Sequence, residues 1–427
     1  MQGKSGYYLV LNSGSSSIKF AGYAQEGLRE LFSGQIDAKG QGKGQRKAAE
    51  FAVTCDGQTE TQTLAAGESL SFAPIFTWLT QRMASSPLLG IGHRVVHGGE
   101  AFHNAVMIDD RVITAIQDCS RFAPLHNPSN LQGIDVCRQH YPDIPQIAVF
   151  DTAFHQSLAA KAYLYPLPYG WYQDHGVRRY GFHGTSHEYV VQQAAQLLGF
   201  SHSGSANNRN DNRNDSPNNS PNNSGSFISL HLGNGCSAAA VENGVSRDTT
   251  MGLTPLEGMM MGTRSGDIDP GLAQYLCHAL DISIDEVTNQ LNKASGLLGI
   301  SQLTSDMRDI QAAADQGNEQ AGLALTMFCY RAAKAVAAMR VALSSLDGII
   351  FTGGIGEHSV GVRQRIIEQL AWLGAALDPQ ANEEHGKESG GIISPPDQQP
   401  RVMVIPTDEE RMIAKHVQRL VALSGEQ

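Results

Sequence analysis

Two distant segments of this 427-residue chain share one pattern, in which an apolar strand runs into a turn of small polar residues and then into a second strand. Residues 7–20 read YYLVLNSGSSSIKF, and residues 227–241 read FISLHLGNGCSAAAV. Asn243 and Gly244 follow the second segment as a hairpin signal. The repetition predicts two domains that open in the same way; a coincidence between two unrelated hairpins is the alternative.

The remaining apolar segments alternate between strand and helix patterns. We expect strands at residues 90–97, 146–151, 348–352 and 401–405, and helices at residues 186–198, 322–346, 362–373 and 409–423. The mixture of hairpins and strand–helix–strand units predicts an α/β fold. At about 150 residues per domain, the length allows two to three domains.

One segment does not fit this pattern. Residues 201–226 consist almost wholly of Ser, Asn, Gly, Asp, Arg and Pro. Such a composition cannot bury apolar area, so we expect a mobile insertion before the first strand of the second domain. A fold tolerates an insertion in a connection at small entropic cost.

Charge and cysteine usage exclude several classes of partner and site. The chain carries 31 Lys and Arg against 42 Asp and Glu, a net charge of −11, so nucleic acids and anionic membranes are not expected partners. The six cysteines form no C-x-x-C pair, which argues against zinc or disulfides and fits a reducing cytoplasm. The apolar run at residues 7–11 is too short for a signal peptide, and no run is long enough to span a membrane.

Glycine-rich turns suggest a phosphate ligand. P-loop and Rossmann motifs are absent, but residues 12–17, 233–237 and 353–357 each follow an apolar strand. Small residues let backbone N–H groups converge on an anion, and Lys19 lies within reach of the first turn. An ordinary hairpin or helix start is the alternative for each turn. Three of them favour a nucleoside triphosphate in a cleft between the domains.

Two arginines and one carboxylate are candidates for the chemistry. Arg94 shares a strand face with Val96 and needs an anionic partner, which an internal salt bridge would also supply. Arg264 lies in a glycine-rich loop, where a solvated side chain is the alternative. Asp151 follows an apolar strand, where sites of α/β sheets gather, although a helix cap is plausible too.

Histidines and the last helix add further candidates. His183 lies in a loop between glycines, whereas His187 fits the start of a helix. Glu409 stands at the start of the last helix, where an acid either holds Mg²⁺ or stabilises the helix dipole.

These segments, in this order, resemble the signature segments of the acetate kinase family. The matching segments are residues 11–20, 93–99, 123–128, 150–155, 179–187, 231–235, 261–270 and 353–357. The resemblance covers nearly the whole chain apart from residues 201–226. It implies two ribonuclease-H-like domains of the actin/Hsp70/sugar-kinase type with an interdomain active-site cleft.

The resemblance also implies a domain organisation and an assembly. The first domain would span residues 1–152 and the second residues 153–406, and a C-terminal helix at residues 407–427 would pack back toward the first domain. A homodimer would form through the second domain.

The implied reaction is ATP + acetate ⇌ ADP + acetyl phosphate with Mg²⁺, or with Mn²⁺ in its place. By resemblance Asn12 and Glu409 hold the metal, and Lys19 contacts phosphate. Arg94 binds the carboxylate, Asp151 is the catalytic carboxylate, and His183 and Arg264 stabilise the transferring phosphoryl group. The residues expected around ATP are His231, Leu232, Gly233, Asn234, Gly235, Asp306, Met307, Arg308, Gly353, Gly354, Ile355, Gly356 and Glu357. Those expected around the methyl group are Val96, Leu125, Phe182 and Pro255.

The chemistry suits these residue types. Acetate is ionised at neutral pH, so the reaction needs positioning and charge neutralisation more than a base. Arginine bonds both carboxylate and phosphate with its planar fork. We therefore interpret Asp151 as an orienting group, for Arg264 or for metal-bound water.

Two residues depart from the family pattern. Asp408 stands where Asn is usual, and Cys236 stands where Gly or Ala is usual. Two alternative functions remain. A non-catalytic ATP-driven switch on the same fold would not need a carboxylate pocket with two arginines, and a propionate kinase would differ only in pocket size.

Overall fold

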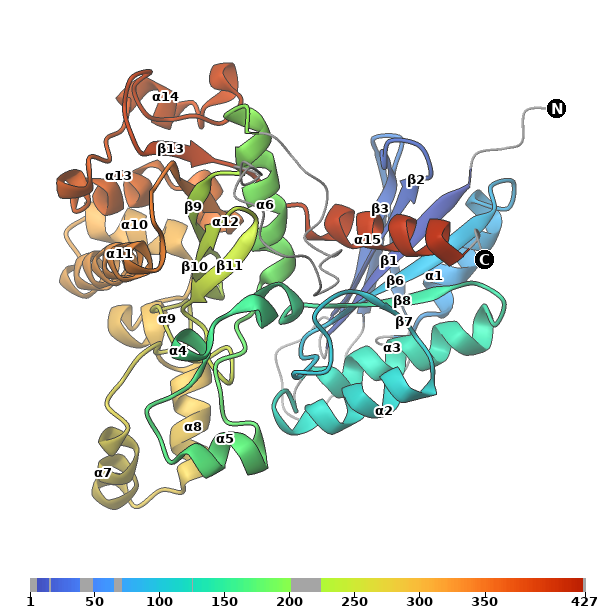
Figure 1. Ribbon diagram of the computed structural model, residues 1–427, viewed down its shortest axis with the longest axis horizontal. Coiled ribbons are helices and arrows are strands. Elements are labelled where there is room, and N and C mark those ends of the chain that lie inside the picture. The colour runs from blue at the N-terminus through green and yellow to red at the C-terminus, as the bar shows by residue number, and fades with distance from the viewer. Residues whose placement is uncertain are drawn as a thin grey trace, which may run out of the picture. The chain divides into compact units, whose positions relative to one another are not determined.

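Each half of the chain is built on its own mixed β-sheet (Figure 1). The computed structural model describes residues 6–14, 17–38, 49–64, 71–124, 126–200 and 224–424. The expectations for Leu125 and for residues 201–223 lie outside them. The chain divides into unit 1, Met1–Phe154 with Asp408–Gln427, and unit 2, His155–Thr407.

The sheet of unit 1 has eight strands in the order β5-β4-β3-β2-β1-β6-β8-β7. Its central strand β1 pairs antiparallel with β2 and parallel with β6, and β6 pairs parallel with β8. The bounds are β1 Tyr7–Ser13, β2 Ser17–Ala24, β3 Glu30–Ala38, β4 Ala49–Cys55, β5 Gln58–Leu64, β6 Leu88–Val95, β7 Val106–Met107 and β8 Gln146–Phe150. The helices are α1 Ala73–Arg82, α2 Asp110–Asp118, α3 Asn127–His140 and α15 Glu409–Ser424.

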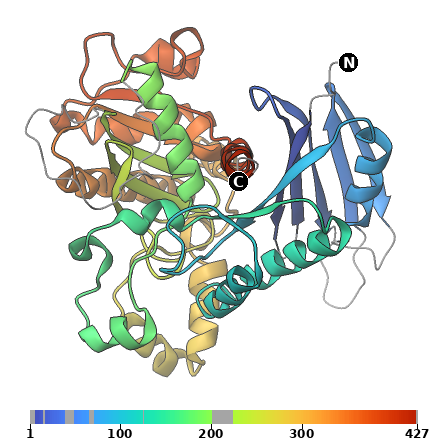
Figure 2. The ribbon, with the colours of Figure 1, turned by 45° about the vertical axis from the view of Figure 1, so that its right-hand side comes forward.

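Alternate side chains of β1 enter two different cores, because successive residues of a strand point to opposite faces. Leu9 and Leu11 join the cluster that contains residues of α1, whereas Tyr8 and Val10 join the cluster that contains Ile413 of α15. Helices α1 and α15 therefore cover opposite faces of this sheet (Figure 2). Burial of both faces explains the continuous apolar run at residues 7–11.

The sheet of unit 2 repeats the same connectivity with five strands, in the order β11-β10-β9-β12-β13. Strand β9 pairs antiparallel with β10 and parallel with β12, as β1 does with β2 and β6. The bounds are β9 Ser226–Leu232, β10 Cys236–Glu242, β11 Val245–Thr249, β12 Gly348–Thr352 and β13 Arg401–Val404. The expected strand–turn–strand units and the two-domain α/β fold are confirmed.

Helices cover both faces of the second sheet. Helix α6 and helix α11 each contact β9, and they lie on opposite sides of the sheet (Figure 1). The helices are α4 Ala160–Tyr163, α5 Tyr169–His175, α6 Gly184–Leu197, α7 Gly271–Leu280, α8 Ile284–Lys293, α9 Gly296–Ser301, α10 Met307–Asp315, α11 Glu319–Met339, α12 Gly353–His358, α13 Val360–Glu368 and α14 Pro379–Glu383.

Several boundaries differ from the sequence expectations, and caps explain two of them. Helix α11 begins at Glu319 because the side chain of Asn318 accepts a hydrogen bond from the Ala321 amide. Ser359 caps α13 in the same way, because its side chain accepts a hydrogen bond from the Val362 amide. Helix α13 therefore begins at Val360, two residues before the expected start. Residues 353–357, expected as a turn, instead form most of the short helix α12.

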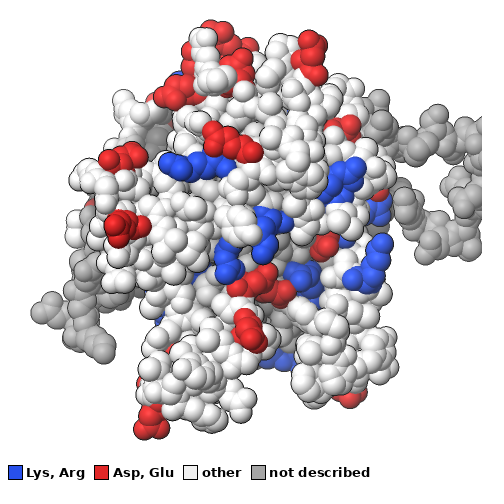
Figure 3. All heavy atoms as spheres, turned by 90° about the vertical axis from the view of Figure 1, so that its left-hand side faces the viewer, with Lys and Arg blue, Asp and Glu red and all other residues white. Residues whose placement is uncertain are grey.

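Two surface properties bear on the expected partners. No helix in the described ranges is long and apolar enough to cross a membrane. On the face drawn in Figure 3, basic side chains lie singly or in small groups among acidic ones.

Candidate active site

Four of the predicted site residues meet in unit 1 at the carboxyl ends of neighbouring strands. Asn12 is near the end of β1, Arg94 is near the end of β6, and Asp151 directly follows β8. The parallel pairing of these three strands brings their carboxyl ends to one edge of the sheet. Glu409 is the first residue of α15, which packs on the same strands.

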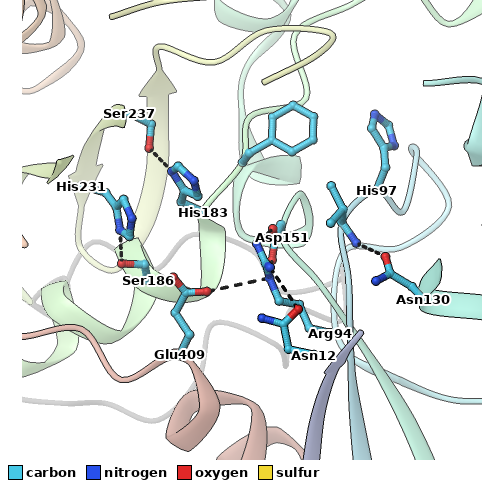
Figure 4. Close-up of polar contacts among 12 residues, drawn as sticks. Asn12, Arg94, His97, Asn130, Asp151, His183, Ser186, His231, Ser237 and Glu409 are labelled. Atoms are coloured by element: carbon cyan, nitrogen blue, oxygen red, sulfur yellow. Dashed lines mark hydrogen bonds and ion pairs between the residues drawn. The ribbon is translucent and has the colours of Figure 1, made fainter. Parts of the chain in front are cut away.

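Arg94 is the centre of this cluster (Figure 4). Its Nε donates to Asp151 Oδ1 at 2.9 Å and its Nη2 donates to Oδ2 at 2.5 Å, a bidentate pair. Its Nη1 donates to Asn12 Oδ1 at 3.2 Å, and its Nε lies 3.8 Å from Glu409 Oε2. The internal salt bridge that the sequence left open is present. Within unit 1 the partner of Asp151 is Arg94, and the expectation that Asp151 orients Arg264 or metal-bound water stays a prediction.

Burial and charge act on this cluster in opposite directions. Burial disfavours the charged form of Arg94, but the charges of Asp151 and Glu409 outweigh it and raise the pKa of the guanidinium. Burial and the charge of Glu409 raise the pKa of Glu410, while Lys19 and Arg94 lower it. The cluster thus concentrates negative charge around one arginine.

The donor set fits a hard divalent cation. Asn12, Asp151 and Glu409 offer only amide and carboxylate oxygens, which Mg²⁺ prefers. Among the described residues, no three His, Cys, Asp or Glu side chains form a metal cage. A metal held here would therefore depend on Asn12 and on oxygens from substrate or water, as Mg²⁺ sites commonly do.

Lys19 lies opposite Asn12 in the β1–β2 pairing, and its side chain is exposed. The turn between these strands is closed by a bond from the Gly14 amide to the Ser17 carbonyl. The prediction that Lys19 contacts phosphate is consistent with this position but remains a prediction.

In unit 2, His183 occupies the residue before α6 with a left-handed backbone, φ = 56°. This region is costly for a side chain other than glycine, and such strain gathers at functional sites. The His183 Nδ1 bonds Ser237 Oγ at 2.9 Å (Figure 4), and the ring stacks on His231 with centroids 4.2 Å apart. Ser186 Oγ in turn bonds His231 Nδ1 at 2.8 Å.

The glycine-rich turn after β9 faces both His183 and Arg264. A methyl group added at Gly235 would lie 3.3 Å from His183 Nε2 and 3.4 Å from Arg264 Nη1. Arg264 donates to the Pro255 carbonyl at 3.1 Å, and burial lowers the pKa of its guanidinium. The imidazole, the guanidinium and the turn thus surround one point, as an anion site requires.

The turn after β12 reaches the same strand. A methyl group added at Gly353 would lie 2.8 Å from the Leu232 carbonyl oxygen, and φ = 74° at Gly353 independently favours glycine. Glu357 Oε1 accepts hydrogen bonds from the Gly353 amide at 2.9 Å and the Thr407 amide at 3.1 Å. Through these two hydrogen bonds Glu357 fixes the backbone at the start of α12, in addition to any contact with a ligand.

The structure gives weaker support to two other groups of predicted residues, those near Asp306 and those of the methyl pocket. Asp306 caps α10 and pairs with Arg308 at 2.6 Å, and hydrogen bonds from Arg308 lower the pKa of Asp306 to about 2. Val96 is buried in unit 1 and its amide donates to Asn130 Oδ1 at 3.1 Å (Figure 4). Phe182 and Pro255 belong to unit 2, so the proposed methyl pocket stays a prediction.

Sequence reasoning missed the polar residues behind His183. His187 lies in the first turn of α6, which begins at Gly184, and both of its ring nitrogens bond buried serines, Ser229 and Ser237. The spacing of His183 and His187, one helical turn apart, was the signal available in the sequence.

Comparisons with known proteins show which family the chain belongs to. The model of the Acetokinase family matches residues 7–415. A protein of Ectopseudomonas mendocina named acetate kinase is 47% identical over 406 residues, which cover 95% of this chain and 96% of that protein. Among solved structures, a propionate kinase from Francisella tularensis is similar with TM-score 0.86 and 39% identity, covering 97% of this chain and 99% of that one. The acetate kinase of Porphyromonas gingivalis has TM-score 0.84 and 36% identity, covering 98% and 100%.

Proposed function

Because this chain belongs to the acetokinase family, we propose that it catalyses reversible, Mg²⁺-dependent phosphoryl transfer from ATP to acetate, giving acetyl phosphate and ADP. The observation that carries the proposal is the Arg94 cluster, in which an arginine with oriented hydrogen bonds lies beside oxygen donors suited to a metal. Family membership makes the protein a phosphotransferase with a carboxyl acceptor.

Unit 1 supplies the carboxylate half of the reaction. Arg94 binds the acetate carboxylate, and Asp151 holds the guanidinium in place through two hydrogen bonds. Acetate is already a nucleophile at neutral pH, so Asp151 orients Arg94 and does not act as a base. When bound, a divalent cation near Asn12 and Glu409 supplies positive charge to phosphate oxygens.

Unit 2 supplies the phosphate half. The turns at Gly235 and Gly353 bring backbone close to a ligand, and His183 and Arg264 point at the first of them. Arg264 neutralises charge on the transferring group and His183 donates a hydrogen bond to it, and such electrostatic stabilisation is the main requirement of phosphoryl transfer.

The proposed assembly is a cytoplasmic homodimer that forms through unit 2. Three helices of this unit expose large apolar side chains: Tyr169 and Trp171 of α5, Tyr275 and Leu280 of α7, and Ile284 of α8. Large exposed apolar side chains mark interaction surfaces where they form a contiguous patch. All six cysteines are free, which is consistent with a reducing compartment. A Tyr275→Asp variant that remains dimeric by light scattering would place the interface elsewhere.

A trapping assay tests the reaction itself. Protein, ATP, Mg²⁺ and acetate are mixed with hydroxylamine, which converts acetyl phosphate into a coloured hydroxamate. We expect hydroxamate and ADP in equal amounts, both dependent on acetate. ADP release that is independent of acetate would instead support an ATP-driven switch, and Mn²⁺ replacing Mg²⁺ would show which metals the site accepts.

Propionate phosphorylation is the second candidate function, favoured by the similarity to the Francisella tularensis propionate kinase. Steady-state kinetics with formate, acetate, propionate and butyrate separate the two. We expect acetate to exceed propionate by about tenfold in kcat/KM, since one methylene in an apolar pocket discriminates roughly 10- to 200-fold. The opposite order would assign the enzyme to propionate.

A further inference from the structure

A chain of buried hydrogen bonds runs behind His183, away from the side that faces Gly235. His183 Nδ1 bonds Ser237 Oγ at 2.9 Å, Ser237 Oγ bonds His187 Nε2 at 2.8 Å, and His187 Nδ1 bonds Ser229 Oγ at 2.6 Å. Ser229, Ser237 and His187 are fully buried. These three residues are therefore held in one geometry by surrounding packing, whereas His183 is partly exposed.

The fold explains why these residues meet. His183 is the residue before α6 and His187 lies in the first turn of that helix, and the rings of both bond Ser237 Oγ. Helix α6 packs on β9, which contains Ser229, and Ser237 lies on the adjacent strand β10. The antiparallel pairing of β9 and β10 places both serines beside the helix start.

Proton positions in this chain are linked. Burial and the charges of His155 and His231 hold the pKa of His187 well below its usual value, so His187 is neutral. A neutral imidazole donates from one nitrogen and accepts at the other. His187 therefore donates to one serine and accepts from the other, and Ser237 either gives a proton to His183 Nδ1 or takes one from it.

The two arrangements differ at the nitrogen that faces the ligand. If Ser237 donates to Nδ1, neutral His183 carries its own proton on Nε2, which lies beside Gly235 and Arg264. In the reverse arrangement, neutral His183 would direct a lone pair at an anion. Only the first arrangement provides a hydrogen-bond donor to a phosphoryl oxygen.

Three side chains lie around the His183 ring. His231 stacks on its ring, Arg264 faces the same glycine, and neutral His187 lies behind Ser237. Cys236 is next to Ser237, and burial raises the pKa of its thiol to about 12, so it stays uncharged. Arg264 already brings a cation to this point, so a hydrogen-bond donor is what His183 can add there.

We propose that Ser237 is a positioning residue that donates its hydroxyl hydrogen to His183 Nδ1 and so keeps the His183 proton on Nε2, aimed at the transferring phosphoryl group. The chain runs from Ser229 through His187 and Ser237 to His183, with one hydrogen in each bond. This inference rests on the proposed function and deepens it, because it assigns the protonation state in which His183 acts.

Matched serine variants give the first test. Ser237→Ala and Ser229→Ala each remove one fully buried hydroxyl from His187, but only Ser237→Ala removes the partner of His183. We expect Ser237→Ala to lower kcat by roughly 10- to 100-fold, the usual effect of losing such a support, with little change in either KM. Ser229→Ala should lower kcat less than about threefold. Equal losses in both variants would overturn the proposal.

A double-mutant cycle separates positioning from packing. In a His183→Gln background, Ser237→Ala should cause no further loss of kcat, because the group it orients is already gone. Ser237→Thr keeps the hydroxyl and should retain most of the activity. A full additional loss in the His183→Gln background would show that Ser237 acts through the fold alone.

Nitrogen NMR of the unmodified protein tests the tautomer directly. With ¹⁵N-labelled histidine, and with His183→Gln to assign the signal, we expect neutral His183 protonated at Nε2, both alone and with Mg²⁺ and ADP. A proton on Nδ1 with bare Nε2 in both states would refute the inference. If hydroxamate formation fails altogether, the proposed function is wrong while this measurement still decides the tautomer.

Discussion

Arg94 and Arg264 make very different contacts, although both are predicted to bind anions. Arg94 holds the buried Asp151 through two hydrogen bonds, whereas the hydrogen bonds of Arg264 go to the Pro255 carbonyl and the Met261 sulfur. Loss of Arg94 leaves a buried carboxylate without its partner, which is strongly destabilising. Loss of Arg264 removes no charged contact of this kind.

We therefore predict different stability effects for two equally inactive variants. Arg94→Ala and Arg264→Ala should each lower kcat/KM on the order of 10³-fold or more, as arginines do in phosphoryl transfer. Arg94→Ala should also lower Tm, while Arg264→Ala should not. Lysine should rescue either position poorly because it lacks the bidentate fork. Steady-state kinetics and thermal melts check this, and near-normal turnover in Arg264→Ala would remove Arg264 from the site.

Val96 sets the predicted size limit for the substrate. Its amide is fixed by Asn130, and it follows Arg94 by two residues, just beyond the end of β6. By the family resemblance, Val96 is predicted to contact the alkyl end of a carboxylate that Arg94 holds. We expect Val96→Ala to raise propionate kcat/KM relative to acetate, mainly through the KM for propionate, with ATP kinetics little changed. An unchanged acetate-to-propionate ratio would show that Val96 does not line the pocket.

At the scale of elements, close packing of α15 on β6 positions the predicted metal ligand. A methyl group added at Gly92 would lie 2.6 Å from Ile413 Cγ2 and 2.7 Å from Val417 Cγ2, both in α15. Glu409 begins that helix, so displacement of α15 moves Glu409 as well.

We predict that Gly92→Ala raises the Mg²⁺ concentration needed for half-maximal rate and lowers stability by about 1–3 kcal/mol, the usual cost of overpacking. Gly322→Ala is the matched control, because a methyl group there meets nothing within 4 Å. In helix α11 this change should be neutral or stabilising by up to about 1 kcal/mol. If Gly92→Ala lowers stability but leaves the Mg²⁺ dependence unchanged, the packing of α15 does not control metal binding.

Helix α12 depends on Arg363, whose side chain is fully buried. The guanidinium donates to the Gly356 and Glu357 carbonyls and to Asn382, and burial lowers its pKa to about 10. Its hydrogen bonds satisfy carbonyls that the end of a short helix leaves without partners.

We expect Arg363→Met to lower the free energy of unfolding by roughly 3 kcal/mol or more, because several buried carbonyls lose charged donors. The KM for ATP should rise, since α12 contains the predicted ATP turn. Arg363 lies in α13, and so does the exposed Arg365. Arg365→Met should therefore change neither the free energy of unfolding nor the KM for ATP. Urea titrations and ATP kinetics measure both effects. Equal urea midpoints for Arg363→Met and Arg365→Met would show that Arg363 does not stabilise this helix end.

At the scale of the whole molecule, the low-complexity segment is predicted to be dispensable. Its described flanks lie close together, since the Phe200 and Phe227 rings are 6.0 Å apart. Gly225 accepts a hydrogen bond from the Asn243 amide, so a deletion should end before residue 224. We expect removal of residues 203–223 with a short Gly/Ser join to leave kcat unchanged and Tm within a few degrees. A protein that no longer folds would show that the segment is structural.

Much of the architecture follows from local sequence alone. The apolar runs at residues 7–11 and 227–232 and the small-residue turns after them predict both opening hairpins, because strand periodicity and turn chemistry act over a few residues. Exact helix ends did not follow so directly. Asn318 and Ser359 extend α11 and α13 beyond the apolar pattern by capping them.

The side-chain pairings of the site required the tertiary structure. Arg94 and Asp151 are 57 residues apart, and His183 and Ser237 are 54 residues apart. Residue type and family resemblance make Arg94, Asp151 and His183 candidates from the sequence alone, since the chemistry of a side chain depends on its residue type. Their partners depend on which strands pair and which helix face packs on a sheet, and those are long-range contacts that no local pattern encodes.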